Sequence, residues 1–198
     1  MRINVPYFKS EKDVECGPRA LQMVLSYFGK NLTLPEISQL ERQIDTGLVW
    51  TLGIARAAKL AGLNSKVISM TNFSHDDEID YYEKYKGDKG KIVLEELKKE
   101  IGELGVEVEE RDLELTELLS FITRKSIPIV LINWYVISRK EGYSGHFVPL
   151  VGYDSENVLV HNPGIDRASP FMPLKKELFQ KAWESKGTDK DIVIVYNA

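Results

Sequence analysis

The chain has 198 residues, of which 43% are hydrophobic and 28% are charged, and its formal net charge is −4 at pH 7. This is the size of one domain, long enough to bury a substantial core. The mildly acidic balance and the lack of a Lys and Arg stripe argue against a nucleic-acid partner, because phosphates are neutralised by clustered basic residues. No apolar run approaches a membrane span and no signal-like segment follows Met1, so we expect no membrane partner and a cytoplasmic location.

The first predicted element is a helix that begins at Cys16, the only cysteine of the chain. Apolar residues follow at helical spacing, and Gly29 supplies a stop signal. Pro18 suits a first helical turn, and Gly17 leaves room for a group to approach the sulfur. Because free N–H groups and the helix dipole favour a thiolate at this position, we expect Cys16 to have a depressed pKa and to act as a nucleophile.

Periodicity predicts the remaining elements in chain order. Further helices are expected from residue 34 to before residue 47, and at 51–61, 91–104, 116–123 and 174–183. Strands are expected at 65–69, 106–108, 127–134 and 192–196. The polar, tyrosine-rich segment 71–90 is interpreted as either an ordered excursion or a flap.

The strongest strand signal is a hairpin formed by residues 145–153 and 157–163 around an Asp-Ser-Glu turn at 154–156. With this turn, His146 and Asn162 lie near the same open end of paired strands. An amide oxygen of Asn162 there can accept the imidazole N–H and hold the ring of His146. This predicts a Cys-His-Asn constellation in which His146 is the base for Cys16.

Several short motifs carry a resemblance to a known family. Residues 5–8, 15–18, 145–148, 152–154 and 162–163 resemble the C39-like branch of papain-type cysteine peptidases. Residues 49–55 and 186–192 are similar to a subgroup named guanylyl cyclase-like. Together these motifs span almost the whole chain.

The resemblance implies one α+β domain over residues 1–198 with the papain-like fold, in which N-terminal helices carry Cys16 and an antiparallel sheet behind them carries His146 and Asn162. It also implies a peptide or protein tail as substrate and no cofactor. The Cys16 N–H would hold the oxyanion, helped by the residue six positions earlier. That residue is usually a glutamine in the family and is Ser10 in this chain.

Three functions remain open at this point. The leading one is a cysteine hydrolase of peptide or isopeptide bonds. The second, motivated by the shorter reach of Ser10, is a module that binds peptides with little or no turnover. The third is a nucleotide cyclase, as the subgroup name suggests, although the sequence has neither a phosphate-binding Gly-x-x-x-x-Gly-Lys-Ser/Thr loop nor paired carboxylates at strand ends for Mg²⁺. The oligomeric state and the substrate specificity are left undetermined.

Other conspicuous residues have structural interpretations. His161 points to the strand face opposite Asn162 and is expected to be structural or on the surface. His75 and its acidic neighbours are interpreted as a solvated loop, because no thiolate or second histidine stands at metal-ligand spacing. Trp50 is expected in the core, and residues 187–189 are expected to form a turn before the last strand.

Overall fold

The structure is a computed structural model, which describes residues 1–71, 73, 80–164 and 166–197. Its centre is a seven-stranded sheet in the order β2-β1-β7-β3-β4-β5-β6. Among the described strands, β1 and β2 are parallel and the other neighbours are antiparallel. The strands are β1 (Asn64–Ser69), β2 (Glu107–Glu110), β3 (Ser126–Asn133), β4 (Gly145–Tyr153), β5 (Asn157–Asn162), β6 (Ser169–Lys175) and β7 (Ile192–Tyr196).

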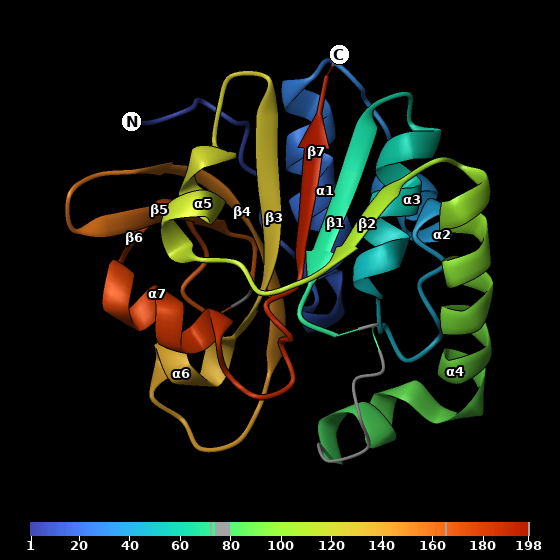
Figure 1. The fold of residues 1–198 in the computed structure, drawn as a ribbon. Coiled ribbons are helices and arrows are strands. Elements are labelled where there is room, and N and C mark those ends of the chain that lie inside the picture. The colour runs from blue at the N-terminus through green and yellow to red at the C-terminus, as the bar shows by residue number, and fades with distance from the viewer. Residues whose placement is uncertain (72, 74–79, 165, 198) are drawn as a thin grey trace.

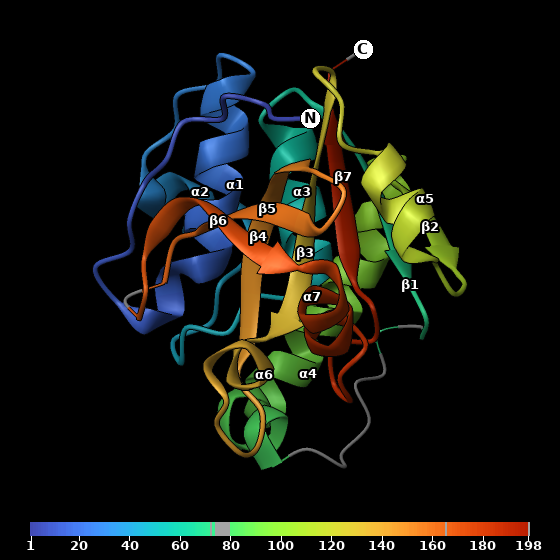
Figure 2. The ribbon, with the colours of Figure 1, turned by 90° about the vertical axis from the view of Figure 1, so that its left-hand side faces the viewer.

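Helices cover both faces of this sheet (Figures 1 and 2). On one face, α1 packs on β3 and β4 while α3 packs on β1 and β7, and α2 and α4 extend this layer. On the other face, α7 packs on β3, β5 and β6. The helices are a short 3₁₀ turn η1 (Asp13–Glu15), α1 (Cys16–Tyr27), α2 (Leu34–Leu40), α3 (Thr51–Leu60), α4 (Asp80–Glu103), α5 (Leu115–Ser120), α6 (Trp134–Ser138) and α7 (Lys176–Trp183).

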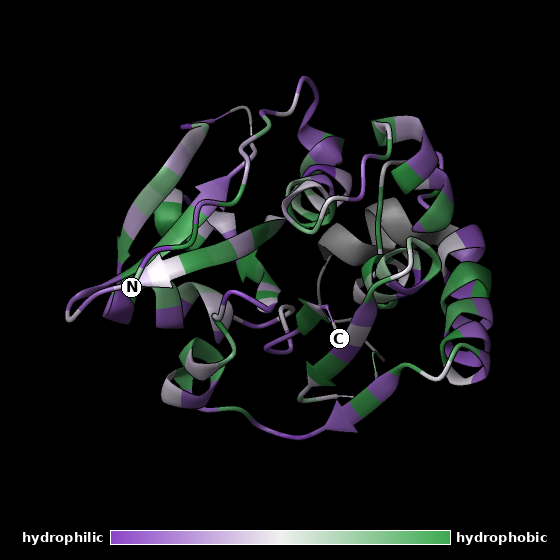
Figure 3. Ribbon diagram, turned by 90° about the horizontal axis from the view of Figure 1, so that it is seen from above, coloured by the Kyte–Doolittle hydropathy of each residue, from purple (hydrophilic) through white to green (hydrophobic). Residues whose placement is uncertain are grey.

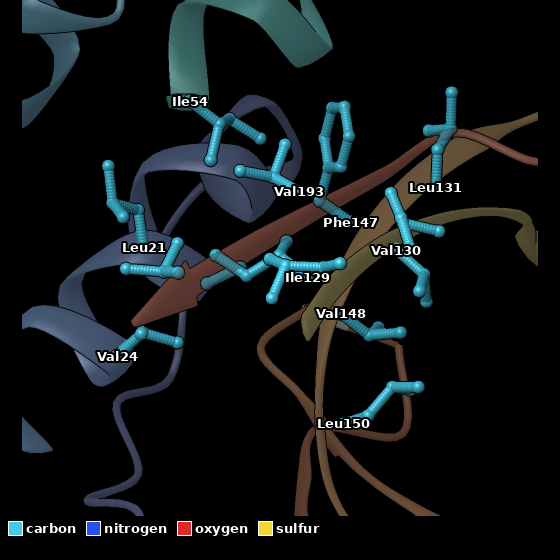
Figure 4. Packing of buried hydrophobic residues seen from close by; sticks show 14 of the residues in the cluster. Leu21, Val24, Ile54, Ile129, Val130, Leu131, Phe147, Val148, Leu150 and Val193 are labelled. Atoms are coloured by element: carbon cyan, nitrogen blue, oxygen red, sulfur yellow. The ribbon is translucent and has the colours of Figure 1, made fainter. Parts of the chain in front are cut away.

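The core lies where α1 and α3 meet the central strands. Leu21 of α1 and Ile54 of α3 point toward Ile129 of β3 and Val193 of β7 (Figure 4), and all four side chains are fully buried. Helices on both faces explain why β3 and β7 are continuously apolar, since neither strand has a side that faces water. In Figure 3 the hydrophobic segments make up much of the strands, and the hydrophilic ones lie in the loops and on the outer helices.

The α+β fold and the predicted hairpin are confirmed, but strand β6 and helix α6 were not predicted. Strand β6 contains Pro170 and Pro173, which argue against a strand, yet β6 is the edge strand, where a missing N–H group is tolerated. Helix α6 has only five residues and follows β3 directly, capped by the Asn133 side chain, which accepts a hydrogen bond from the Tyr135 N–H. Helix α4 begins at Asp80, so the second half of the 71–90 segment is helical.

Candidate active site

Cys16 stands at the first position of α1, where the sequence predicted it. Helix α1 packs on β4, which brings the half-buried thiol against the strand that carries His146. The backbone N–H groups of Phe147 and Gly17 lie near the sulfur and favour its ionised form. The space beside Gly17 is tight, because a Cβ there would lie 3.3 Å from the Val49 side chain.

The side chains of His146 and Asn162 are joined by a bond of 2.8 Å between Nε2 and Oδ1. The Asn162 amide has a fixed orientation, because its Nδ2 group donates to the backbone carbonyls of Asp166 (3.0 Å) and Arg167 (2.9 Å), and its Oδ1 accepts from the Gly164 N–H at 3.0 Å. Oδ1 therefore faces the imidazole, and His146 must carry its proton on Nε2. This leaves Nδ1 as an unprotonated base.

The pair is shielded from water. His146 is 8% exposed and Asn162 is fully buried. The Trp134 ring lies 5.2 Å from the imidazole between centroids, and its Nε1–H donates to Asp166 Oδ2 at 3.3 Å. On another side, a Cβ at Gly164 would lie only 3.0 Å from His146 Cε1, so glycine lets the backbone cover the pair closely.

Cys16 and His146 line one pocket with a volume of about 360 Å³. Residues 46–51 form one wall, whereas Trp134 and Tyr135 of α6 contribute to another. The residues that line the pocket also include the acidic Asp13 and Asp166 and the basic Lys140. The pocket thus combines apolar and aromatic surface with charged groups around a thiol and a base.

The ionisation of the site differs from the expected one. Burial raises the pKa of the Cys16 thiol, an effect that the nearby N–H groups of Phe147 and Gly17 only partly offset and that Glu41 reinforces. Burial also lowers the pKa of His146 to about 4, opposed by the bond to Asn162 and the charge of Asp13. The expected depressed thiol pKa is therefore wrong for this conformation, because desolvation outweighs the helix N-terminus. The resting pair is a neutral thiol and a neutral imidazole.

Ser10 is not brought into the pocket. It is 3% exposed, and its backbone N–H donates to the Pro163 carbonyl at 2.8 Å. Its buried hydroxyl has no hydrogen-bond partner in the described part of the chain, and Ser10 is not among the residues that line the pocket. The structure therefore brings together Cys16, His146 and Asn162 and leaves Ser10 beside them.

Sequence reasoning missed a hydrogen bond that supports the wall of this pocket. Thr51 lines the pocket and donates from its hydroxyl to the buried carboxylate of Asp191 at 2.5 Å. Trp50 also lines it while remaining 3% exposed, so it belongs to both core and wall. The available signal was the pair of motifs at 49–55 and 186–192, which hold these residues.

The other predicted residues have the following places. His161 is fully buried and structural, bonded to the backbone of Val5 and Phe171. Residues 187–189 form the expected turn, in which the Asp191 N–H donates to the Thr188 carbonyl. His75 lies outside the described residues. Within the described part of the chain, no helix is long and apolar enough to cross a membrane.

The sequence model of a family described as guanylylate cyclase matches residues 5–195. The chain belongs to this family. No curated protein sequence is similar enough to count as a match. The cyclase reaction that the family name implies uses Mg²⁺ held by carboxylates. Among the described residues, no group of three or more His, Cys, Asp or Glu side chains is placed to hold a metal ion.

Solved structures similar to this member of the family are peptidase domains. The peptidase domain of Streptococcus ComA, a bifunctional ABC transporter of a quorum-sensing pathway, is 16% identical, with a TM-score of 0.58 over 98% of this chain and 100% of that one. A protein from Bacillus anthracis, described as a C39-like peptidase, is 14% identical, with a TM-score of 0.58 over 100% of this chain and 98% of that one. A double-glycine-motif protease of an AMS/PCAT transporter, in complex with its leader peptide, is 18% identical, with a TM-score of 0.57 over 100% and 94%. The chain therefore has the fold of C39 peptidase domains.

Proposed function

We propose that this protein is a cysteine hydrolase that cleaves peptide or isopeptide bonds, with Cys16 as nucleophile, His146 as base and Asn162 as the residue that orients His146. The observation that carries the proposal is the 2.8 Å hydrogen bond between His146 and Asn162, whose amide has a fixed orientation. His146 also lines the same pocket as Cys16, which has the only thiol group of the chain. The fold of C39 peptidase domains supports it.

The proposed reaction uses only side chains and the amide. Nδ1 of His146 accepts the thiol proton as the Cys16 sulfur attacks the carbonyl carbon. The resulting tetrahedral oxyanion is held by the Cys16 backbone N–H. The imidazolium then gives the proton to the leaving amine, and the C–N bond breaks to leave a thioester. Water, losing its proton to the same Nδ1, hydrolyses the thioester and restores the thiol.

The neutral resting pair makes this a general-base mechanism. The proton leaves the thiol only as the carbon–sulfur bond forms, because a raised thiol pKa and an imidazole pKa of about 4 disfavour a preformed ion pair. Each pKa unit of that mismatch corresponds to about 1.4 kcal/mol. Substrate contacts that exclude water and stabilise the oxyanion must supply this energy.

The oxyanion role of Ser10 stays a prediction. In the present conformation Ser10 does not line the pocket, so a contribution from its hydroxyl requires the loop at residues 9–14 to fold closer to Cys16. The peptide partner and the cytoplasmic location likewise remain predictions.

The test is labelling and turnover with peptide-derived electrophiles and fluorogenic peptides. The parent should react at Cys16 with a peptidyl acyloxymethyl ketone and release fluorophore, whereas Cys16→Ala should do neither and His146→Ala should lose turnover. Failure of every peptide probe to modify Cys16 in folded protein would sink the hydrolase assignment.

A second candidate is a peptide-binding module, favoured by the raised thiol pKa and the place of Ser10 outside the pocket. It predicts that peptides bind the parent and Cys16→Ala equally and leave unchanged. Calorimetry with both proteins, followed by mass spectrometry of the recovered peptide, separates binding from hydrolysis.

A further inference from the structure

The first ten residues run along the hairpin toward the candidate site, and we call residues 1–10 the N-terminal strap (Figure 2). The strap begins beside the far end of β4, where the Ile3 N–H donates to the Val151 carbonyl at 2.8 Å. It ends at the site, where the Ser10 N–H donates to the Pro163 carbonyl at 2.8 Å. Ile3 and Val5 are buried, so the strap is packed rather than loosely attached.

His161 is the buried link between the strap and β5. Its Nδ1 accepts the backbone N–H of Phe171 at 3.0 Å, and because that N–H is a donor only, the ring proton must lie on Nε2. Nε2 therefore donates to the Val5 carbonyl of the strap at 2.9 Å. The neutral imidazole satisfies both bonds, and a doubly protonated ring cannot, since it would point an N–H at the N–H of Phe171.

The strap also holds the two residues that follow His161. The Tyr7 hydroxyl donates to the backbone carbonyl of Asn162 at 2.9 Å, and the Ser10 bond fixes Pro163. The Tyr7 ring meets the His161 ring edge-on, with 5.5 Å between centroids. Three consecutive residues, 161–163, are thus fastened to the strap by Val5, Tyr7 and Ser10.

We propose that Tyr7 and His161 are positioning residues that set Asn162, and through it the ring of His146, by fastening the strap to the end of β5. This inference rests on the proposed function for its effect on turnover. The Asn162 side chain orients His146 through a hydrogen bond of 2.8 Å. A shift of the Asn162 backbone would therefore displace this bond. A misplaced His146 ring should lower kcat and leave KM unchanged, because the base is displaced while the wall of the pocket stays in place.

The charges around His161 favour its neutral form. The Arg2 guanidinium stacks 3.5 Å from the Phe171 ring centroid and, together with burial, lowers the pKa of His161. The Tyr7 hydroxyl, whose pKa is raised by burial, stays neutral. From β6 the ring is faced by the apolar Phe171, at 4.5 Å between centroids. Acidification therefore works against the bonds that this link makes.

The test compares Tyr7→Phe with the matched control Tyr27→Phe. Both changes remove a hydroxyl that donates to a backbone carbonyl, but the Tyr27 bond, 3.1 Å to Arg124, has no link to residues 161–163. Tyr7→Phe should lower kcat about fivefold with KM unchanged, whereas Tyr27→Phe should stay within about twofold. His161→Gln should lower kcat further, and should shift the acid limb of the pH profile in comparison with the parent.

A second measurement does not depend on turnover. In the parent, the His146 Nε2–H should give a protected, downfield-shifted NMR signal because it is bonded to Asn162. In Tyr7→Phe this proton should exchange faster with water, and in Tyr27→Phe it should not. Equal exchange in all three proteins would overturn the inference even if His161→Gln fails to fold. Absence of hydrolysis in every protein, with the exchange difference present, would refute the proposed function and leave the positioning role standing.

Discussion

The hydroxyl of Thr51 donates to the carboxylate of Asp191 over 2.5 Å, joining the first turn of α3 to the start of β7. Both side chains are buried, with exposures of 2% and 0%. Thr51 also lines the pocket, so one hydrogen bond ties the wall of the candidate site to the centre of the sheet.

Replacing Thr51 by valine should therefore destabilise the protein. The change keeps the shape but removes a donor from a buried carboxylate, which costs about 1 to 3 kcal/mol and lowers Tm by about 5 °C. Calorimetry checks this, with Thr51→Ser expected to restore most of the loss. Thr71→Val, which removes a partly exposed bond to Asp189, is the matched control and should cost less. Equal losses of stability in Thr51→Val and Thr71→Val would show that the buried Thr51 bond contributes no more than the partly exposed one.

Asn162→Asp should impair the site. The Asn162 Nδ2 group donates to the Asp166 and Arg167 carbonyls, and a carboxylate would place an oxygen against both. We expect kcat to fall at least tenfold, with Asn162→Ala also lowering kcat while the fold is retained. Steady-state kinetics and circular dichroism report the two effects. If Asn162→Asp is as active as the parent, the two hydrogen bonds donated by the Asn162 amide are not needed to orient His146.

The pKa of His146, lowered from 6.5 to about 4 by burial, predicts two acid effects. The base stays neutral down to about pH 4, so the acid limb of kcat/KM set by this group should lie there and not near 6.5. A depressed folded pKa also means that the unfolded state takes up the proton first. Stability from this group is complete above pH 6.5 and declines as the pH falls toward 4, by about 3 kcal/mol in total.

Urea unfolding of the parent and of His146→Gln at pH 7 and pH 4.5 checks this sign. The parent should lose more stability between the two pH values than the variant does. An equal loss in both proteins would mean that His146 titrates normally. Asp13→Asn should move the acid limb lower still, because the Asp13 charge favours the imidazolium.

Alkylation of Cys16 should be slow at neutral pH, because burial raises the pKa of the thiol above its ordinary value. Glu41 is fully buried, its two carboxylate oxygens have no hydrogen-bond partner among the described residues, and its own pKa is raised well above the usual range by desolvation. At a pH where the Glu41 carboxyl is ionised, its charge opposes thiolate formation, so Glu41→Gln should lower the Cys16 pKa. Iodoacetamide rates from pH 6 to 10 measure this, and an unchanged or higher midpoint in Glu41→Gln would refute the coupling.

Ser10→Ala should leave turnover within about twofold and should not lower Tm, because its buried hydroxyl has no partner among the described residues to lose. Ser10→Gln should raise turnover on a small activated ester, since a longer amide can reach charge that develops in the transition state. Alkylated protein serves as the background control. A hundredfold loss in Ser10→Ala would identify the serine as a working oxyanion donor after all.

The sequence predicted the parts of the site that depend on local rules. The turn at 154–156 determined the hairpin, and the hairpin placed His146 beside Asn162. The helix start at Cys16 followed from its neighbours in the chain. These elements are set by periodicity and turn chemistry over a few residues.

What was missed depends on tertiary contacts. The thiol pKa is governed by burial against β4, which no local pattern reveals. The bond between Thr51 and Asp191 joins residues 140 positions apart. Strand β6 was hidden by two prolines that only an edge position tolerates. The motif predicted the place of Ser10 in the sequence relative to Cys16. It did not predict the direction in which the Ser10 hydroxyl points.

The position of β7 bears on when the site comes into being. The last strand of the chain lies between β1 and β3 and pairs with both, so no hydrogen-bonded ladder joins those two strands until Ile192–Tyr196 has been added. During synthesis these residues follow Cys16 and His146, so both site residues are made before the strand that completes the sheet. The nascent chain therefore carries a nucleophile and a base without a completed sheet to hold them. The proposed hydrolase would therefore gain its ordered site only once β7 has been inserted between β1 and β3.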